Sequence, residues 1–346
     1  MKRTGTSFVC ALLVACGGDD VNPEPGDTAT LGPDGDATAG PVLRLNHLQA
    51  LGTHNSYHVL DGPPADPALD YEHDPLADQL DLGVRHFELD VHRDAVSGEV
   101  RVYHIKSADE GTTCATLADC LGQLRAWSDA HPRHHAIVVL IEPKDDLARL
   151  AVRVGGDPAA TGELLWDGHV ADVEPIVRAA WPDRLLTPAM VQGDAPTLDA
   201  AIVGDGWPTI EATRQHLVVV LNDTSALRTE YRAVADPACF VFAEPGEPDA
   251  AFVKADNPRA DPARLAAAVE AGYLVRTRSD GDAVVDPEET AAALASGAHL
   301  VSSDYPRARD DGAHPGYRVP WPGTPEHPSR CNPVTAPPGC SDAAIE

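Results

Sequence analysis

The chain has 346 residues, of which 43% are apolar and 23% charged, and its formal net charge at pH 7 is −28. This length suits a single α/β barrel, which runs to about 250 residues or more. So acidic a surface repels nucleic acid at long range, and we expect no nucleic-acid partner, although a bound cation would still let the protein act on a phosphate.

The first residues indicate an export signal. Two basic residues precede an apolar run, residues 8–15, which is far shorter than the ~20 residues that span a bilayer. The run ends in Leu-Val-Ala-Cys16, which resembles a bacterial lipobox. We expect a signal peptide over residues 1–15 and lipidation of Cys16, with an ordinary secretory signal as the alternative. The protein would be anchored in the bacterial cell envelope in the first case and secreted in the second.

The composition then predicts a tether followed by one folded domain. Residues 16–41 are rich in Gly, Asp, Pro, Thr and Ala, which is typical of a disordered acidic linker. A single domain is expected over residues 42–346. Its strand candidates are Leu48–Thr53, His86–Val91, Val100–His104, Ala136–Glu142, Leu217–Asn222, Phe240–Ala243, Tyr273–Thr277 and His299–Ser303.

Helix-like segments lie between these strands, among them Thr116–His131, Pro175–Ala180 and Pro262–Ala271. Alternation of strand and helix predicts a parallel sheet. The strands are apolar on both faces, most clearly over residues 137–141, as in strands that are covered on both sides. A closed barrel and an open doubly wound sheet both fit this pattern.

The cysteines form two close pairs. In an exported protein, Cys114 with Cys120 and Cys331 with Cys340 indicate disulfides. Zinc binding is the competing interpretation, but the spacings fit no common zinc pattern. Cys239 lies in an apolar run and is expected to be a buried free thiol.

Polar residues collect at the ends of the strand candidates, and in a parallel barrel these ends share one mouth. Glu88 and Asp90 are two apart on one strand, so both face the same side. Burying two like charges is costly unless a cation offsets them. With Glu142 and the side-chain oxygen of Asn55 they make an all-oxygen set, which suits calcium or magnesium rather than zinc. The alternative for these four residues is that they form surface salt bridges. Asn222, Glu244 and Asp304 are further polar residues at the ends of strand candidates.

Two histidines also end strand candidates. His54 and His104 are candidates for an acid–base pair, because imidazole accepts and donates protons near neutral pH. The chain has 15 histidines, and we expect structural or solvated roles for the others.

Four segments, in this order, resemble the catalytic half of phosphoinositide-specific phospholipases C, and most of all their bacterial calcium-dependent branch: Thr53–Tyr57, Val84–Asp90, Val102–His104 and Val139–Glu142. The segments Tyr273–Arg278 and His299–Pro306 and the close cysteine pairs are also similar, so the resemblance covers most of residues 42–340. It implies a TIM-type (β/α)8 barrel of the PLC-like phosphodiesterase kind. It also implies one calcium ion, with magnesium less favoured, held by Asn55, Glu88, Asp90 and Glu142.

The resemblance implies cleavage of phosphatidylinositol, or a related phosphodiester, through a 1,2-cyclic inositol phosphate. His54 would contact the phosphoryl group or move protons, and His104 would protonate the leaving oxygen. Which group is the base stays open. Arg276 and Arg278 lie on one strand face as candidates to bind phosphate or sugar hydroxyls, with a structural salt bridge as the alternative. Lys144 is a weaker candidate for a phosphate contact.

Two other functions stay open. A glycerophosphodiester phosphodiesterase or a sphingomyelinase D-like enzyme would share the histidines, the carboxylates and a metal, but in those families the first histidine is usually followed by Arg, where this chain has Asn55. A non-catalytic lipoprotein that binds calcium or sugar is expected to have lost a histidine, and both are present. No heptad pattern or apolar stripe indicates assembly, so we expect a monomer.

Overall fold

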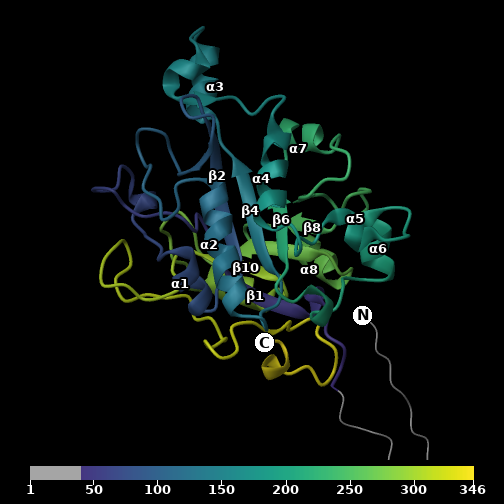
Figure 1. Cartoon of the computed structure of the whole chain (residues 1–346). Helices are drawn as coiled ribbons and strands as arrows, with labels where there is room; N and C mark the ends of the chain where they lie inside the picture. Colours follow the sequence, from purple (N-terminus) through teal and green to yellow (C-terminus); the bar gives the residue numbers. More distant parts are fainter. Residues whose placement is uncertain (1–39) are drawn as a thin grey trace, which may run out of the picture. The chain divides into compact units, whose positions relative to one another are not determined.

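A parallel barrel lies at the centre of residues 40–346, the part of the chain that the computed structural model describes (Figure 1). Neighbouring strands around it are β7 (Phe240–Val241), β6 (Leu217–Leu221), β4 (Ile137–Pro143), β2 (His86–Asp94), β1 (Leu48–Thr53), β10 (Leu300–Ser303), β9 (Leu274–Arg278) and β8 (Phe252–Lys254). A parallel bridge between Phe242 and Phe252 joins the two ends of this row. The predicted (β/α)8 barrel is confirmed. The predictions for residues 1–15, for Cys16 and for most of the linker lie outside the described residues.

Helices connect most of the strands and pack around the barrel: α1 (Leu76–Asp81), α2 (Leu117–Ala130), α3 (Asp146–Arg153), α4 (Val173–Ala180), α5 (Pro188–Gln192), α6 (Leu198–Gly204), α7 (Ala226–Tyr231), α8 (Pro262–Glu270) and α9 (Pro287–Ala295). Local sequence sets several of their starts. Thr116 caps α2 by accepting a hydrogen bond from Asp119 N–H at 3.1 Å, and Asp261 caps α8, which begins with proline. None of the helices in residues 40–346 has the length and apolar character needed to cross a bilayer.

The barrel strands are buried on both faces, as their composition predicts. Every residue of β6 and the first five residues of β4 are buried. β1 and β2 approach each other at Gly52, whose Cα pairs with that of His86. A Cβ at Gly52 would lie 2.2 Å from the His86 ring, so only glycine permits this contact. The close approach brings the end of β1, just before His54, beside the start of β2.

One predicted barrel strand is wrong. Residues 100–104 do not join the barrel: β3 (Val100–Val102) pairs antiparallel with the end of β2. Only five residues separate β2 from β3, which allows a hairpin, whereas a parallel crossover needs about a dozen residues or more. The strand that completes the barrel is β8, which the sequence did not reveal. The remaining short strands, β5 (Glu163–Leu164) and β11 (Arg330–Cys331), pair with β2 and β1.

The cysteine predictions are confirmed. Disulfides join Cys114 to Cys120 and Cys331 to Cys340, and Cys239 is a buried free thiol. The second disulfide stabilises the segment whose β11 covers the start of β1.

Candidate active site

The carboxyl ends of the barrel strands deliver polar side chains to one rim, as parallel strands require. These residues are His54 and Asn55 after β1, Glu88 and Asp90 in β2, Glu142 in β4, Asn222 after β6, Lys254 in β8, Arg276 and Arg278 in β9, and Asp304 after β10. Asn55 has a φ of 44°, a left-handed conformation that asparagine tolerates better than most residues. The chain therefore turns sharply directly after His54.

His54 is oriented by a buried carboxylate. Its Nδ1 lies 2.9 Å from Asp304 Oδ1. Burial alone would raise the pKa of Asp304, but His54 and Arg278 lower it below its usual range, so the carboxylate is ionised. Because an ionised carboxylate only accepts hydrogen bonds, Nδ1–H donates to Asp304 and Nε2 is the basic nitrogen. Arg278 Nη2 lies against the same ring, 3.0 Å from Nδ1 and 3.2 Å from Nε2.

His104 is oriented in the same way from a different element. It follows β3 in a tight loop in which Ile105 and Asp109 exchange backbone hydrogen bonds of 2.9 and 2.8 Å. His104 Nδ1 lies 2.9 Å from Asp109 Oδ2, and the buried His58 shares the same carboxylate through its Nε2. Burial would raise the pKa of Asp109, but the hydrogen bonds from His104 and His58 lower it to about 2. Both predicted histidines thus have a carboxylate on Nδ1.

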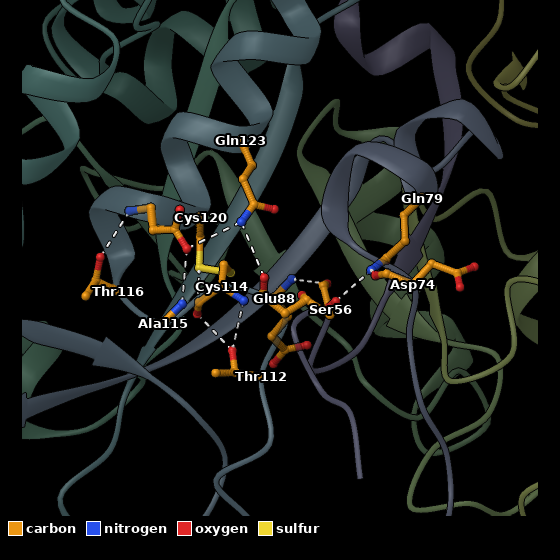
Figure 2. Close-up of a disulfide and its surroundings, with 12 residues drawn as sticks. Ser56, Asp74, Gln79, Glu88, Thr112, Cys114, Ala115, Thr116, Cys120 and Gln123 are labelled. Atoms are coloured by element: carbon orange, nitrogen blue, oxygen red, sulfur yellow. Dashed lines mark hydrogen bonds between the residues drawn. A yellow bond between two sulfur atoms is a disulfide. The ribbon is translucent and has the colours of Figure 1, made fainter. Parts of the chain in front are cut away.

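The disulfide between Cys114 and Cys120 supports the loop that carries His104. The residues just before it pair with the segment after His54: Thr113 N–H donates to Tyr57 C=O at 2.8 Å. Figure 2 shows this disulfide with Ser56, whose Oγ accepts a hydrogen bond from Glu88 N–H at 2.8 Å. The disulfide therefore fixes the segment before α2, and the hydrogen bond from Thr113 links that segment to the one that follows His54.

Three carboxylates, Glu88, Asp90 and Glu142, lie together on the neighbouring strands β2 and β4. The strand register pairs Asp90 with Glu142 across β2 and β4. The amide of Asn222 donates to Glu88 at 2.7 Å and to Glu142 at 2.5 Å. Glu88 also accepts from Arg276 at 2.6 Å. Burial would raise the pKa of Glu88, but Arg276 opposes this most strongly and the pKa is held well below its usual range.

Asp90 is the member of this group whose surroundings call for a cation. It is 1% exposed, and neither carboxylate oxygen makes a hydrogen bond within residues 40–346. Burial raises its pKa well above the usual range; the charge of Lys144 opposes this shift, and the charges of Glu142 and Glu88 add to it. A divalent cation would offset this cost. Asn55 donates its amide nitrogen to Tyr71 Oη at 3.0 Å, which leaves its oxygen as the group for a cation.

The donor types therefore fit calcium, but the side chains are not yet arranged around an ion. In the described part of the chain, no three His, Cys, Asp or Glu side chains converge as a metal site requires. Instead, the ammonium group of Lys144 contacts Glu142 and lies 3.7 Å from Asp90 Oδ2.

The three predicted substrate-binding residues lie in two places: Arg278 is at the rim beside His54, whereas Arg276 and Lys144 pair with carboxylates. Arg278 contacts His54 at the rim and is 19% exposed. Arg276 is 1% exposed and bonds to Glu88, Asp256 and Ser302, which are the contacts expected of the structural salt bridge that the sequence left open as the alternative. The ammonium group of Lys144 lies against the carboxylates of Glu142 and Asp90.

Sequence reasoning assigned no role to four residues of this site. Asn222 and Asp304 directly follow strands, so their positions at the rim were visible in the sequence. Lys254, which donates to Asn222 Oδ1 at 2.8 Å, lies in the strand that was missed. Asp109 is placed by a loop, for which hydrophobic periodicity gives no signal.

The chain matches the family model described as "Phosphoinositide phospholipase C, Ca2+-dependent" over residues 43–101 and 97–333. Among solved structures, it resembles a calcium-dependent phosphoinositol-specific phospholipase C from Pseudomonas sp (18% identity, 76% of this chain, 90% of that chain, TM-score 0.53). It also resembles a Ca2+-dependent phosphatidylinositol-specific phospholipase C from Streptomyces antibioticus (19% identity, 76% of this chain, 95% of that chain, TM-score 0.55). At these identities the two structures support the fold. No curated protein matches the chain.

Proposed function

Because the chain belongs to the calcium-dependent phosphoinositide phospholipase C family, we propose that it cleaves phosphatidylinositol with His54 and His104 as its acid–base pair. The observation that carries this proposal is that each histidine has Nδ1 on an aspartate, Asp304 or Asp109. That pairing fixes the tautomer and makes Nε2 the nitrogen of each ring that exchanges a proton with the substrate. At His54 this nitrogen lies 3.2 Å from Arg278 Nη2, and Arg278 would turn to the phosphate when the substrate binds.

The reaction requires one proton to leave and one to arrive. The inositol 2-hydroxyl attacks phosphorus and gives its proton to His54 Nε2. The bond from phosphorus to the diacylglycerol oxygen breaks, and His104 gives its Nε2 proton to that oxygen. The products are diacylglycerol and a 1,2-cyclic inositol phosphate. Glu88 is a poor alternative base, because Arg276 and Asn222 already bind its oxygens.

Charge on the phosphoryl oxygens has to be stabilised while the bonds change. Arg278 lies beside His54 Nε2 and would donate to one of these oxygens. Asn55, Glu88, Asp90 and Glu142 would hold calcium, which when bound supplies further positive charge at the phosphate.

The test is to incubate the protein with phosphatidylinositol vesicles in calcium, in magnesium and in chelator, and to follow the products by phosphorus NMR. A cyclic phosphate signal that requires calcium is the expected result. A glycerophosphate-type monoester without a cyclic product would instead indicate a glycerophosphodiester phosphodiesterase. Absence of turnover together with absence of calcium binding would overturn the proposal in favour of a non-catalytic role.

Asp304→Asn is expected to lower kcat by about 10²–10³-fold, because the amide cannot hold His54 in the tautomer that leaves Nε2 basic. KM and calcium affinity should stay within about threefold, since Asp304 contacts neither phosphate nor the proposed ligands in this arrangement. The kcat–pH profile should also lose the limb that reports the basic histidine. An unchanged kcat would remove Asp304 from the catalytic arrangement.

Export and lipidation at Cys16 are part of the proposal, with residues 42–346 as one catalytic domain that acts as a monomer. The two disulfides in residues 40–346 support an oxidising compartment. Mass spectrometry of the N-terminus of the protein from bacterial membranes would test this: an unmodified Cys16 would contradict the anchor.

A further inference from the structure

Lys144 is held close to the carboxylates by its backbone. It lies two residues beyond Glu142, at the end of β4. Its N–H donates to Val91 C=O at 2.9 Å, and its C=O accepts from the indole of the buried Trp166 at 3.1 Å. The backbone of Lys144 is therefore fixed directly after β4 and beside β2, and these two strands carry Glu142 and Asp90.

The ammonium group provides the local charge balance for those two carboxylates. It contacts Glu142 Oε1 and lies 3.7 Å from Asp90 Oδ2. Among residues 40–346, no other basic side chain forms an ion pair with Asp90 or Glu142. Glu88 has a different partner, Arg276, at 2.6 Å.

The two cations differ in their freedom to leave. Arg276 is 1% exposed and bonds to three different side chains. The side chain of Lys144 is 25% exposed, and its flexible stem can carry the ammonium group into water without disturbing the barrel. Arg276 is a permanent partner of Glu88, whereas Lys144 can be exchanged.

We propose that Lys144 is a built-in counter-ion of the calcium site, which its ammonium group occupies between Asp90 and Glu142 until calcium displaces it. This inference rests on the proposed calcium site of those residues. Displacing a bound ammonium group costs free energy, so Lys144 weakens calcium binding. In return it stabilises the calcium-free protein, in which the buried Asp90 and the partly exposed Glu142 would otherwise repel each other.

The experiment is calcium titration by calorimetry of the full chain and of Lys144→Met, with Lys254→Met as the matched control. The Lys254→Met substitution also removes one positive charge from the rim of the barrel, but Lys254 contacts Asn222 and Asp256 rather than Asp90 or Glu142. Lys144→Met should tighten the calcium Kd by about tenfold or more, and Lys254→Met by less than about threefold. Without calcium, Lys144→Met should also have the lower Tm, and its Tm should rise further than that of the parent when calcium is added.

Other outcomes separate this inference from the proposed site. If the parent binds calcium, Asp90→Asn loses that binding, and Lys144→Met binds no more tightly, the counter-ion role is wrong and the calcium site stands. If neither the parent nor Lys144→Met binds calcium, both fail. Should Lys144→Met prove unfolded by circular dichroism, Lys144→Gln, which retains a polar end, takes its place with the same expected direction.

Discussion

His104→Ala is expected to lower kcat on phosphatidylinositol by about 10³-fold while calcium affinity stays within about twofold. Loss of a general acid costs about 10²–10⁴-fold in rate. His104 bonds to Asp109 and not to Asn55, Glu88, Asp90 or Glu142, so the proposed calcium ligands keep their contacts. Vesicle turnover and calorimetry on the same preparation give the two numbers.

The leaving group distinguishes an acid from a residue that only supports the fold. On an inositol phosphodiester with a p-nitrophenyl leaving group, which departs without a proton, the defect of His104→Ala should shrink to about tenfold or less. The corresponding defect of His54→Ala should persist, because the attacking hydroxyl still has to lose its proton. His169→Ala is the control, since this histidine is half exposed and pairs with Asp172. Activity of His104→Ala within tenfold of the parent on the lipid would refute the acid role.

The barrel could be predicted from the sequence because its strands are covered on both faces. Residues 137–141 and 217–221 are continuous apolar runs, and helix-like segments separate most of the strands. The sequence did not reveal β8 because this strand has only three residues and no helix precedes it in residues 243–251. Residues 100–104 were wrongly predicted as a barrel strand, because a hairpin strand that packs on the core is as apolar as a barrel strand.

The site residues that lie in or directly after strands could be predicted from the sequence. Those positioned by a loop, or by the pairing of opposite charges, could not. His54, Asn55 and Glu142 follow from their positions at the ends of strands, and Glu88 follows from its place two residues before Asp90 on one face of β2. The partnership of Asp109 with His104 depends on a loop conformation, and Lys144 depends on which side chain fills the space beside Asp90. A sequence shows that several charges lie close together, but it does not show which opposite charge each one contacts.

Asp90→Asn is expected to weaken calcium binding by about 100-fold or more and to lower activity at fixed calcium by a similar factor. Asparagine keeps the shape of the side chain but removes one of the negative charges that set calcium affinity. Calorimetry gives the affinity, and raising calcium above the new Kd should restore part of the activity if Asp90 acts only as a ligand.

The same change should stabilise the protein when calcium is absent. The pKa of Asp90 is raised by burial and by its acidic neighbours, so its ionised form costs stability at neutral pH, and asparagine relieves that cost. The calcium-free variant should therefore have a Tm above that of the parent, by a few degrees for about 1–2 kcal/mol. Calcium at a concentration that saturates the parent should reverse the order, because the parent binds it more tightly and gains more stability from binding than the variant does. A variant that is less stable without calcium, or that binds calcium as tightly as the parent, would show that Asp90 is a structural carboxylate rather than a ligand.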